Sequence, residues 1–162
     1  MTTPKNRGKE SSDDKLFGTV KMRAAIQLAV EDLSHLLSRG YAQKSCVPLV
    51  GNRYKLNVRQ QKAIQGMSAS QEQIVYRTKH SLPESDLRDE EVVIDGFNAL
   101  ILLESLLSDA YLFKGVDGFY RDLSSVHGSY KKVQQTSRAI ELIADFYVAT
   151  GGAVAPMRCI AH

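Results

Sequence analysis

A proline followed by a run of acidic residues divides this chain into two parts with different hydrophobic patterns. Before Pro83, apolar residues recur every three or four positions, as they do in amphipathic helices. After the acidic run, the first apolar stretch is Val92-Val93-Ile94, a β-branched triplet that is typical of a buried parallel strand. We therefore expect a disordered tail over residues 1–18, a helical module over 19–82, a linker over 83–91 and an α/β domain over 92–162.

The first part carries signals for four helices. Apolar residues from Met22 to Leu37 share one helical face, and Gly40 follows as a stop. Asn57 and Gln60 have the spacing of a capping box, so a helix should begin directly after Asn57. The predicted helices cover residues 19–39, 42–50, 58–66 and 70–80. Short helices joined by glycine-containing turns resemble a helix-turn-helix module.

The second part predicts an incomplete α/β unit. A helix over 98–107 should follow the strand, a β-hairpin should pair residues 111–113 with 119–123, and Thr136 should cap a last helix. The apolar face of that last helix is predicted to contain Ile140, Ile143, Ala144 and Tyr147. These strands are too few for a usual sheet of about four to six. We expect a unit that is truncated, or that pairs with a missing complementary chain or with a second copy in a homo-oligomer.

Charge is divided between the same two parts. Residues 1–82 contain 14 Lys and Arg against 6 Asp and Glu, whereas residues 83–162 contain 7 against 12. A basic part joined to an acidic part suggests that one of them meets a polyanion. The alternative is two solvated surfaces with no shared role.

Several classes of protein are excluded by the same sequence. The longest apolar stretch, residues 99–103, is much shorter than the roughly 20 residues that cross a bilayer, so no membrane is expected. Cys46 and Cys159 lie far apart without neighbouring ligands, which fits neither a zinc ribbon nor a disulfide framework. The polar amino terminus lacks the apolar core of a secretory signal. We expect a cytoplasmic protein.

The basic part contains a candidate nucleic-acid-binding site. Cations contact phosphates without reading sequence, and tyrosines stack on unpaired bases, so residues 39–79 with Tyr41, Tyr54 and Tyr76 predict RNA binding. The alternative is an ordinary solvated helical face. The candidate cations are Arg39, Lys44, Arg53, Lys55, Arg59 and Lys62.

The acidic part contains a candidate metal site. Asp95 follows the predicted strand, at the sheet edge where ligands bind in α/β folds, and Asn98 places an amide nearby. Glu104 adds a second carboxylate, and oxygen ligands of this kind suit Mg²⁺ or Mn²⁺. The alternative is that Asp95 only caps the helix that begins near Asn98.

Two long stretches, residues 32–60 and 92–130, are similar to the domain of unknown function 434 family. Ile94-Asp95-Gly96-Phe97-Asn98 also resembles the first strand of PIN-like and NYN-type ribonuclease domains. The resemblance implies a metal-dependent endoribonuclease fold, with Asp95 at the first acidic position and Asn98 as the accompanying amide. Residues 151–162 contain no Asp or Glu for the acid that a later strand usually supplies, so a degenerate, non-catalytic binding protein is the alternative. The expected catalytic residues are Asp95, Asn98, Glu104 and Asp122, and the expected metal ligands are Asp95, Glu104, Asp117 and Asp122.

Overall fold

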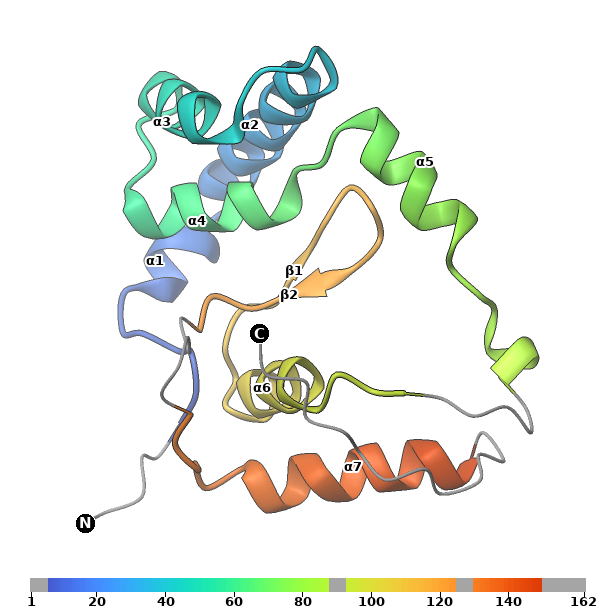
Figure 1. The fold of residues 1–162 in the computed structure, drawn as a ribbon. Helices are drawn as coiled ribbons and strands as arrows, with labels where there is room; N and C mark the ends of the chain where they lie inside the picture. Colours follow the sequence, from blue (N-terminus) through green and yellow to red (C-terminus); the bar gives the residue numbers. More distant parts are fainter. Residues whose placement is uncertain (1–5, 88–92, 125–129, 150–162) are drawn as a thin grey trace. The chain divides into compact units, whose positions relative to one another are not determined.

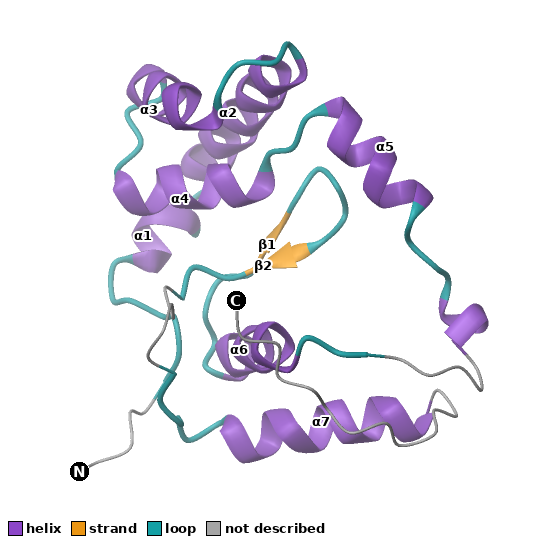
Figure 2. Cartoon of the chain, viewed as in Figure 1, coloured by secondary structure: helices purple, strands orange, loops and turns teal. Residues whose placement is uncertain are grey.

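The protein is described here from a computed structural model that places residues 6–87, 93–124 and 130–149. Over these residues the chain forms seven α-helices, one short 3₁₀ helix and one antiparallel sheet of two strands (Figures 1 and 2). The fold is therefore mixed α and β, with helices dominant. Within the same residues, no helix has the length and apolar character that a bilayer crossing needs.

The chain divides into two compact units that interleave in sequence. One contains Glu10–His80 and Tyr111–Leu123, and the other contains Met1–Lys9, Ser81–Ala110 and Ser124–His162. The first has 13 Lys and Arg against 8 Asp and Glu, and we call it the basic unit. The second has 8 against 10, and we call it the acidic unit. One boundary between the units lies between His80 and Ser81.

The core of the basic unit lies where three helices pack against one another. These are α2 (Val20–Ser38), α3 (Gln43–Arg53) and α4 (Val58–Met67), and α5 (Gln71–Lys79) contacts α2. Leu33 and Ile64 are fully buried between them. The predicted helices at 42–50 and 58–66 are confirmed, but α3 runs three residues past its expected end because Pro48 and Gly51 both fit inside it.

Side-chain caps begin three of these helices at the expected residues. The Thr19 hydroxyl accepts a hydrogen bond from the Met22 amide at the start of α2. Asn57 and Gln60 form the predicted capping box of α4, and Ser70 forms another at the start of α5. Gly40 follows α2 with a φ of 82°, a left-handed conformation that glycine adopts at little cost.

The predicted β-hairpin is present, but it belongs to the basic unit. β1 (Phe113–Lys114) and β2 (Tyr120–Arg121) are antiparallel, with Phe113 opposite Arg121. Phe113 packs edge to face on Phe17, with ring centroids 4.9 Å apart, and both rings are buried. Burial of this aromatic pair attaches the hairpin to the helical core instead of to the α/β unit that we expected.

The predicted disordered tail is wrong for residues 6–18. Asp13–Phe17 forms the short helix α1, whose Phe17 is only 3% exposed. Arg7 is also buried, in the acidic unit. Although these residues are mostly polar, they include one buried apolar side chain, Phe17, and several charged side chains that are paired. These contacts offset the loss of conformational entropy when the segment becomes ordered.

The acidic unit contains the 3₁₀ helix η1 (Glu84–Leu87) and the packed helices α6 (Gly96–Leu107) and α7 (Thr136–Ala149). The buried strand predicted over Val92-Val93-Ile94 is not found: residues 93 and 94 lie outside any strand, and Val93 is 62% exposed. Val92 lies outside the described residues. A β-branched triplet needs a neighbouring strand to pair with, and the described part of this unit contains none.

Helix α6 buries its polar side. Glu104, Ser105 and Ser108 are buried, whereas the leucines of the same helix are only partly covered and Leu106 is 53% exposed. The face of α7 also differs from the prediction, since Ala139 and Ile143 are buried while Ile140 is 45% exposed. Helix α6 can bury its polar side because charged and hydroxyl groups of the same unit, described below, form hydrogen bonds with it.

Candidate nucleic-acid interface

Helix α3 carries predicted cations near both of its ends. Lys44 lies in its first turn and Arg53 is its last residue, while Arg39 precedes α3 and Lys55 follows it. Eleven helical residues span about 16 Å, the length of about five stacked nucleotides at 3.4 Å each. Cys46 and Val50 of α3 are buried in the core of the basic unit.

Three of these cations are exposed and make no ion pair with any residue that the structure describes: Arg39, Lys44 and Lys55. The reason is visible in the sequence, because residues 33–71 contain no Asp or Glu. The backbone of Lys55 has a φ of 54° and its amide donates to the Asn52 carbonyl at 3.2 Å. This backbone geometry fixes the position from which the Lys55 side chain extends, directly after the end of α3.

Arg53 belongs to a small polar group with Asp32 and Tyr54. Its Nε lies 3.3 Å from Asp32 Oδ2, and its guanidinium lies 5.7 Å from the centre of the Tyr54 ring. The Tyr54 hydroxyl donates to the same Asp32 oxygen at 2.8 Å. The pKa of Arg53 is raised, first by its hydrogen bond with Tyr54 and then by the electrostatic effects of Tyr54 and Asp32. It is 71% exposed and remains within reach of an anion.

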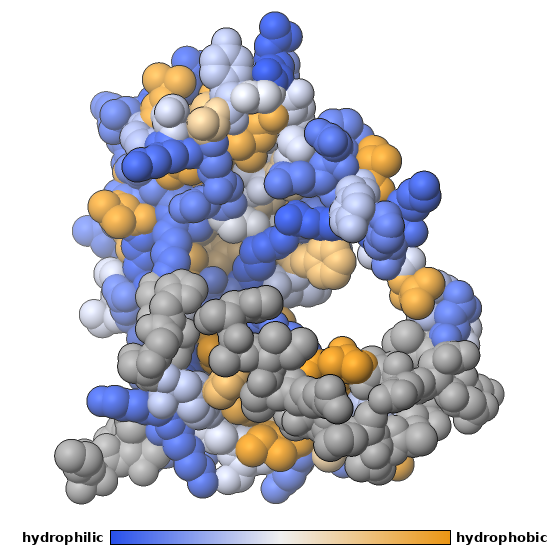
Figure 3. Space-filling model, in the orientation of Figure 1, coloured by the Kyte–Doolittle hydropathy of each residue, from blue (hydrophilic) through white to orange (hydrophobic). Residues whose placement is uncertain are grey.

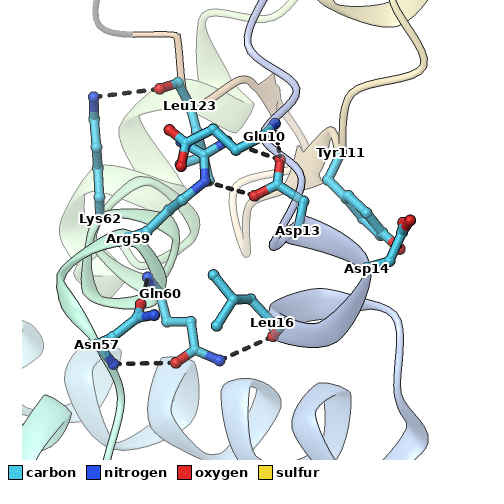
Figure 4. A network of polar contacts seen from close by, with 10 residues as sticks. All are labelled: Glu10, Asp13, Asp14, Leu16, Asn57, Arg59, Gln60, Lys62, Tyr111 and Leu123. Atoms are coloured by element: carbon cyan, nitrogen blue, oxygen red, sulfur yellow. Dashed lines mark hydrogen bonds and ion pairs between the residues drawn. The ribbon is translucent and has the colours of Figure 1, made fainter.

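Arg59 and Lys62, by contrast, are used within the fold. Arg59 donates through Nε and Nη2 to both oxygens of buried Asp13, at 2.6 and 2.8 Å, and through Nη1 to Glu10 at 2.7 Å (Figure 4). The pKa of Arg59 is raised, chiefly by the hydrogen bonds that it donates to Asp13. Lys62 Nζ donates to the Leu123 carbonyl oxygen at 3.5 Å. The predicted RNA-binding role of these two residues therefore competes with contacts that attach α1 and the hairpin to α4.

The tyrosines differ in the same way. Tyr41 is 58% exposed beside α3 and Tyr76 is 63% exposed on α5, where its ring stacks on His80 at 4.1 Å. Tyr54 is partly buried, and its hydroxyl is held by Asp32. Tyr41 and Tyr76 present faces on which a base could stack, whereas Tyr54 supports the side chains around it. Over the basic unit, the face drawn in Figure 3 shows hydrophilic side chains around smaller hydrophobic patches.

Asp95 and Asn98 form a helix cap. Asp95 Oδ1 accepts from the Asn98 amide at 3.3 Å, and Oδ2 accepts from the Asn98 side-chain nitrogen at 2.5 Å. Asp95 therefore caps α6, and its role as a metal ligand stays a prediction. Glu104 lies nine residues further along α6, which places it about 14 Å along the axis and on the opposite side of the helix. One metal ion cannot bridge two carboxylates arranged in this way.

Glu104 is the centre of a buried polar network. It is fully buried and accepts from Arg7 Nε at 2.7 Å, from the Tyr130 hydroxyl at 2.5 Å and from the Thr136 hydroxyl. The pKa of Tyr130 is raised, mainly by burial and then by Glu104. Arg7, Tyr130 and Thr136 were not among the predicted functional residues, because they lie 26 to 97 positions from Glu104 and no local pattern relates them.

Asp117 and Asp122 belong to the basic unit. Asp117 sits in the hairpin loop with its side chain 1% exposed, and it accepts from Arg121 at 2.9 and 2.5 Å and also from Arg77. The pKa of Asp117 is lowered to about 2, chiefly by its hydrogen bonds with Arg121, with smaller contributions from the Phe119 amide and Arg77. Asp122 follows β2 and is partly buried. No three Asp, Glu, His or Cys side chains of the described residues are placed to hold one metal ion.

Comparison with known proteins finds two family matches along the chain. The family described as protein of unknown function DUF434 matches residues 25–80, and the family described as domain of unknown function DUF5616 matches residues 84–155. The similarity to the first family that the sequence indicated is found over residues 32–60, whereas the second predicted stretch, residues 92–130, lies within the match to the second family. Neither match identifies a PIN-like or NYN-type nuclease domain.

An uncharacterized protein of Methanocaldococcus jannaschii is 31% identical to this chain over 121 residues. The match covers 75% of this chain and 58% of the relative, so the chain spans less than two thirds of the relative's length. No solved structure matches the chain. The chain is therefore similar to proteins for which the comparisons give no activity.

Proposed function

We propose that this protein binds single-stranded RNA without cleaving it, along the surface formed by α3 and its flanking cations. We use the name α3 surface for Arg39, Tyr41, Lys44, Arg53 and Lys55, which lie around α3 and its ends, with Lys44 and Arg53 on opposite sides of the helix. The observation that carries the proposal is the exposure of Arg39, Lys44 and Lys55 without an acidic partner among the described residues. Cations left in this state neutralise backbone phosphates and release condensed counterions.

Single strands fit this surface better than a duplex groove does. A major-groove reader inserts a helix whose side chains reach base edges, but α4, the helix after the α3–α4 turn, uses Arg59 and Lys62 inside the fold. Exposed Tyr41 offers a ring for an unstacked base instead. The arrangement of separated cations with an aromatic face is typical of proteins that follow a flexible single-stranded backbone.

Binding without cleavage is proposed because three of the four expected metal ligands already have partners. Asp95 caps α6, Glu104 is paired with Arg7, and Asp117 is paired with two arginines. The metal-dependent ribonuclease expected from the PIN-like resemblance, with Mg²⁺ or Mn²⁺, stays a prediction. Incubating a labelled single-stranded RNA with the protein and Mn²⁺ tests it, since cleavage that disappears in Asp95→Asn would replace our proposal with the nuclease.

The test of binding is its dependence on salt. Four phosphate contacts to a single strand predict a slope of about −3 for log K against log salt concentration. Fluorescence anisotropy of a labelled nine-residue oligouridylate between 50 and 300 mM KCl measures this slope. The double variant Lys44→Gln/Lys55→Gln should weaken binding and make the slope less steep by about 1.4.

The matched control is Lys15→Gln/Lys21→Gln, which removes the same charge from exposed positions of α1 and α2. This control should keep most of the slope. If both double variants change the slope equally, only net charge matters and the α3 surface has no special role. If the wild-type protein does not bind the oligonucleotide at 50 mM KCl, the proposed function is wrong.

A further inference from the structure

A pocket of about 400 Å³ lies between α2 and α3, beside the cations of the α3 surface. Its volume falls within the range of about 300 to 1,000 Å³ that is usual for small-molecule sites. Leu36 and Leu49 supply apolar walls, and Leu49 is 62% exposed although it is a large aliphatic side chain. The lining residues are Asp32, His35, Leu36, Leu49, Val50 and Arg53.

The pocket contains an oriented carboxylate with one unused oxygen. Oδ2 of Asp32 accepts from the Tyr54 hydroxyl at 2.8 Å and lies 3.3 Å from Arg53 Nε. Within the described residues, Oδ1 of Asp32 accepts no hydrogen bond. One hydrogen bond and one ion pair, both at Oδ2, hold the carboxylate in place, and the side chain is 46% exposed. A ligand with hydrogen-bond donors can therefore reach an acceptor whose direction is already set.

We propose that this pocket binds a guanine base of single-stranded RNA, with the Asp32 carboxylate accepting hydrogen bonds from the Watson–Crick edge of the base. The proposal rests on the proposed function, because the exposed cations near the ends of α3 bring the anionic backbone to a pocket that contains the Asp32 carboxylate. Phosphate contacts alone carry no sequence information, so this pocket supplies a preference that the α3 surface lacks.

The choice of guanine follows from the chemistry of an ionised carboxylate, which only accepts hydrogen bonds. Guanine offers two adjacent donors on this edge, N1–H and the N2 amino group. Adenine and cytosine each offer one amino group beside a ring acceptor, and uracil offers one N–H between two carbonyl oxygens, which an anion repels. The leucine walls contact the faces of the base, and Arg53, 71% exposed, is within reach of its phosphate.

Anisotropy with two labelled oligonucleotides tests the pocket: nine uridines, and the same strand with guanosine at the centre. Oδ1 has two lone pairs and can accept from both guanine donors; a pair of hydrogen bonds to one base discriminates by about 1 to 3 kcal/mol, so the guanosine strand should bind about tenfold more tightly. A strand with central inosine, which keeps N1–H and lacks the amino group, should bind with intermediate affinity. The measured quantity is the ratio of the two dissociation constants, guanosine strand to uridine strand.

Two variants connect this ratio to the pocket. Asp32→Asn should bring the ratio close to one, although it removes a negative charge and so tightens both strands. Leu49→Trp fills the pocket without changing charge and should also remove the preference while uridine binding persists. Glu31→Gln is the control, because it makes the same change of charge at an exposed neighbour that does not line this pocket.

The outcomes separate the two proposals. Salt-dependent binding with equal affinity for both strands overturns the guanine pocket and leaves RNA binding in place. If the wild-type protein binds neither strand at 50 mM KCl, both proposals are wrong. A preference that survives in both Asp32→Asn and Leu49→Trp, with far-UV circular dichroism unchanged, places guanine recognition elsewhere and also overturns the pocket.

Discussion

Asp117→Asn gives the sharpest test of how the basic unit uses its charges. Asp117 accepts from Arg121 and Arg77, and the two arginines come from the hairpin and from α5. The hairpin is also joined to the end of α4, since the Val116 amide donates to the Met67 carbonyl at 2.8 Å. Asparagine keeps the shape of the side chain but removes the charge that holds both guanidinium groups.

The magnitude follows from the pKa of Asp117, which falls from 3.8 to about 2 on folding. At 1.36 kcal/mol for each unit, this fall corresponds to about 2.4 kcal/mol of stability at pH 7. The arginine side chains are 36% and 30% exposed, so solvent screens part of the interaction. We expect Asp117→Asn to lower the free energy of unfolding by about 1 to 2 kcal/mol.

The sign of the pH dependence is fixed by the direction of the shift. A carboxyl group with a lowered pKa stabilises the folded state above the unfolded pKa of 3.8, and this contribution is lost as pH falls through about 2. The difference between wild type and Asp117→Asn should therefore be constant from pH 7 to pH 5. It should fall to about half by pH 3.

Urea denaturation followed by far-UV circular dichroism measures this difference, with Glu31→Gln as an exposed control. A variant that matches wild type at pH 7, or a difference that does not shrink in acid, would refute the assignment of Asp117 as an ion-pair partner. If Asp117 is instead a metal ligand, Mn²⁺ should raise the unfolding midpoint of wild type and not that of the variant.

The remaining predictions concern the acidic unit and the helix caps. Glu104→Gln should cost about 3 to 5 kcal/mol, measured by urea denaturation, because it leaves the buried Arg7 charge unpaired; a cost below about 1 kcal/mol would contradict this role. Asp95→Ala should lower stability by about 1 kcal/mol and Asp95→Asn by much less, since asparagine also caps helices, and equal losses would argue against capping. Asn57→Ala should lower the thermal midpoint through a loss of about 1 kcal/mol, whereas Asn57→Ser should keep most of the stability; equal midpoints for the two variants would show that the capping box contributes nothing.

The candidate site could be predicted only in part. Sequence spacing identified Arg39, Lys44 and Lys55 because a long stretch without acids leaves its cations without nearby partners. The same reasoning could not separate them from Arg59, whose partner Asp13 is 46 positions away. It also missed the pocket at Asp32, since the α2 and α3 residues that line it are brought together only when the helices pack.

The sequence alone determined where α2, α4 and α5 begin and that a hairpin follows residue 110, because caps and turns are hydrogen bonds between residues a few positions apart. Tertiary structure decided the rest. Phe17 places the hairpin against the helical core, and Arg7 allows α6 to bury Glu104 instead of its leucines. Burial and ion pairing depend on groups that are distant along the chain, so a periodicity that shows which residues share a face cannot show which face is covered.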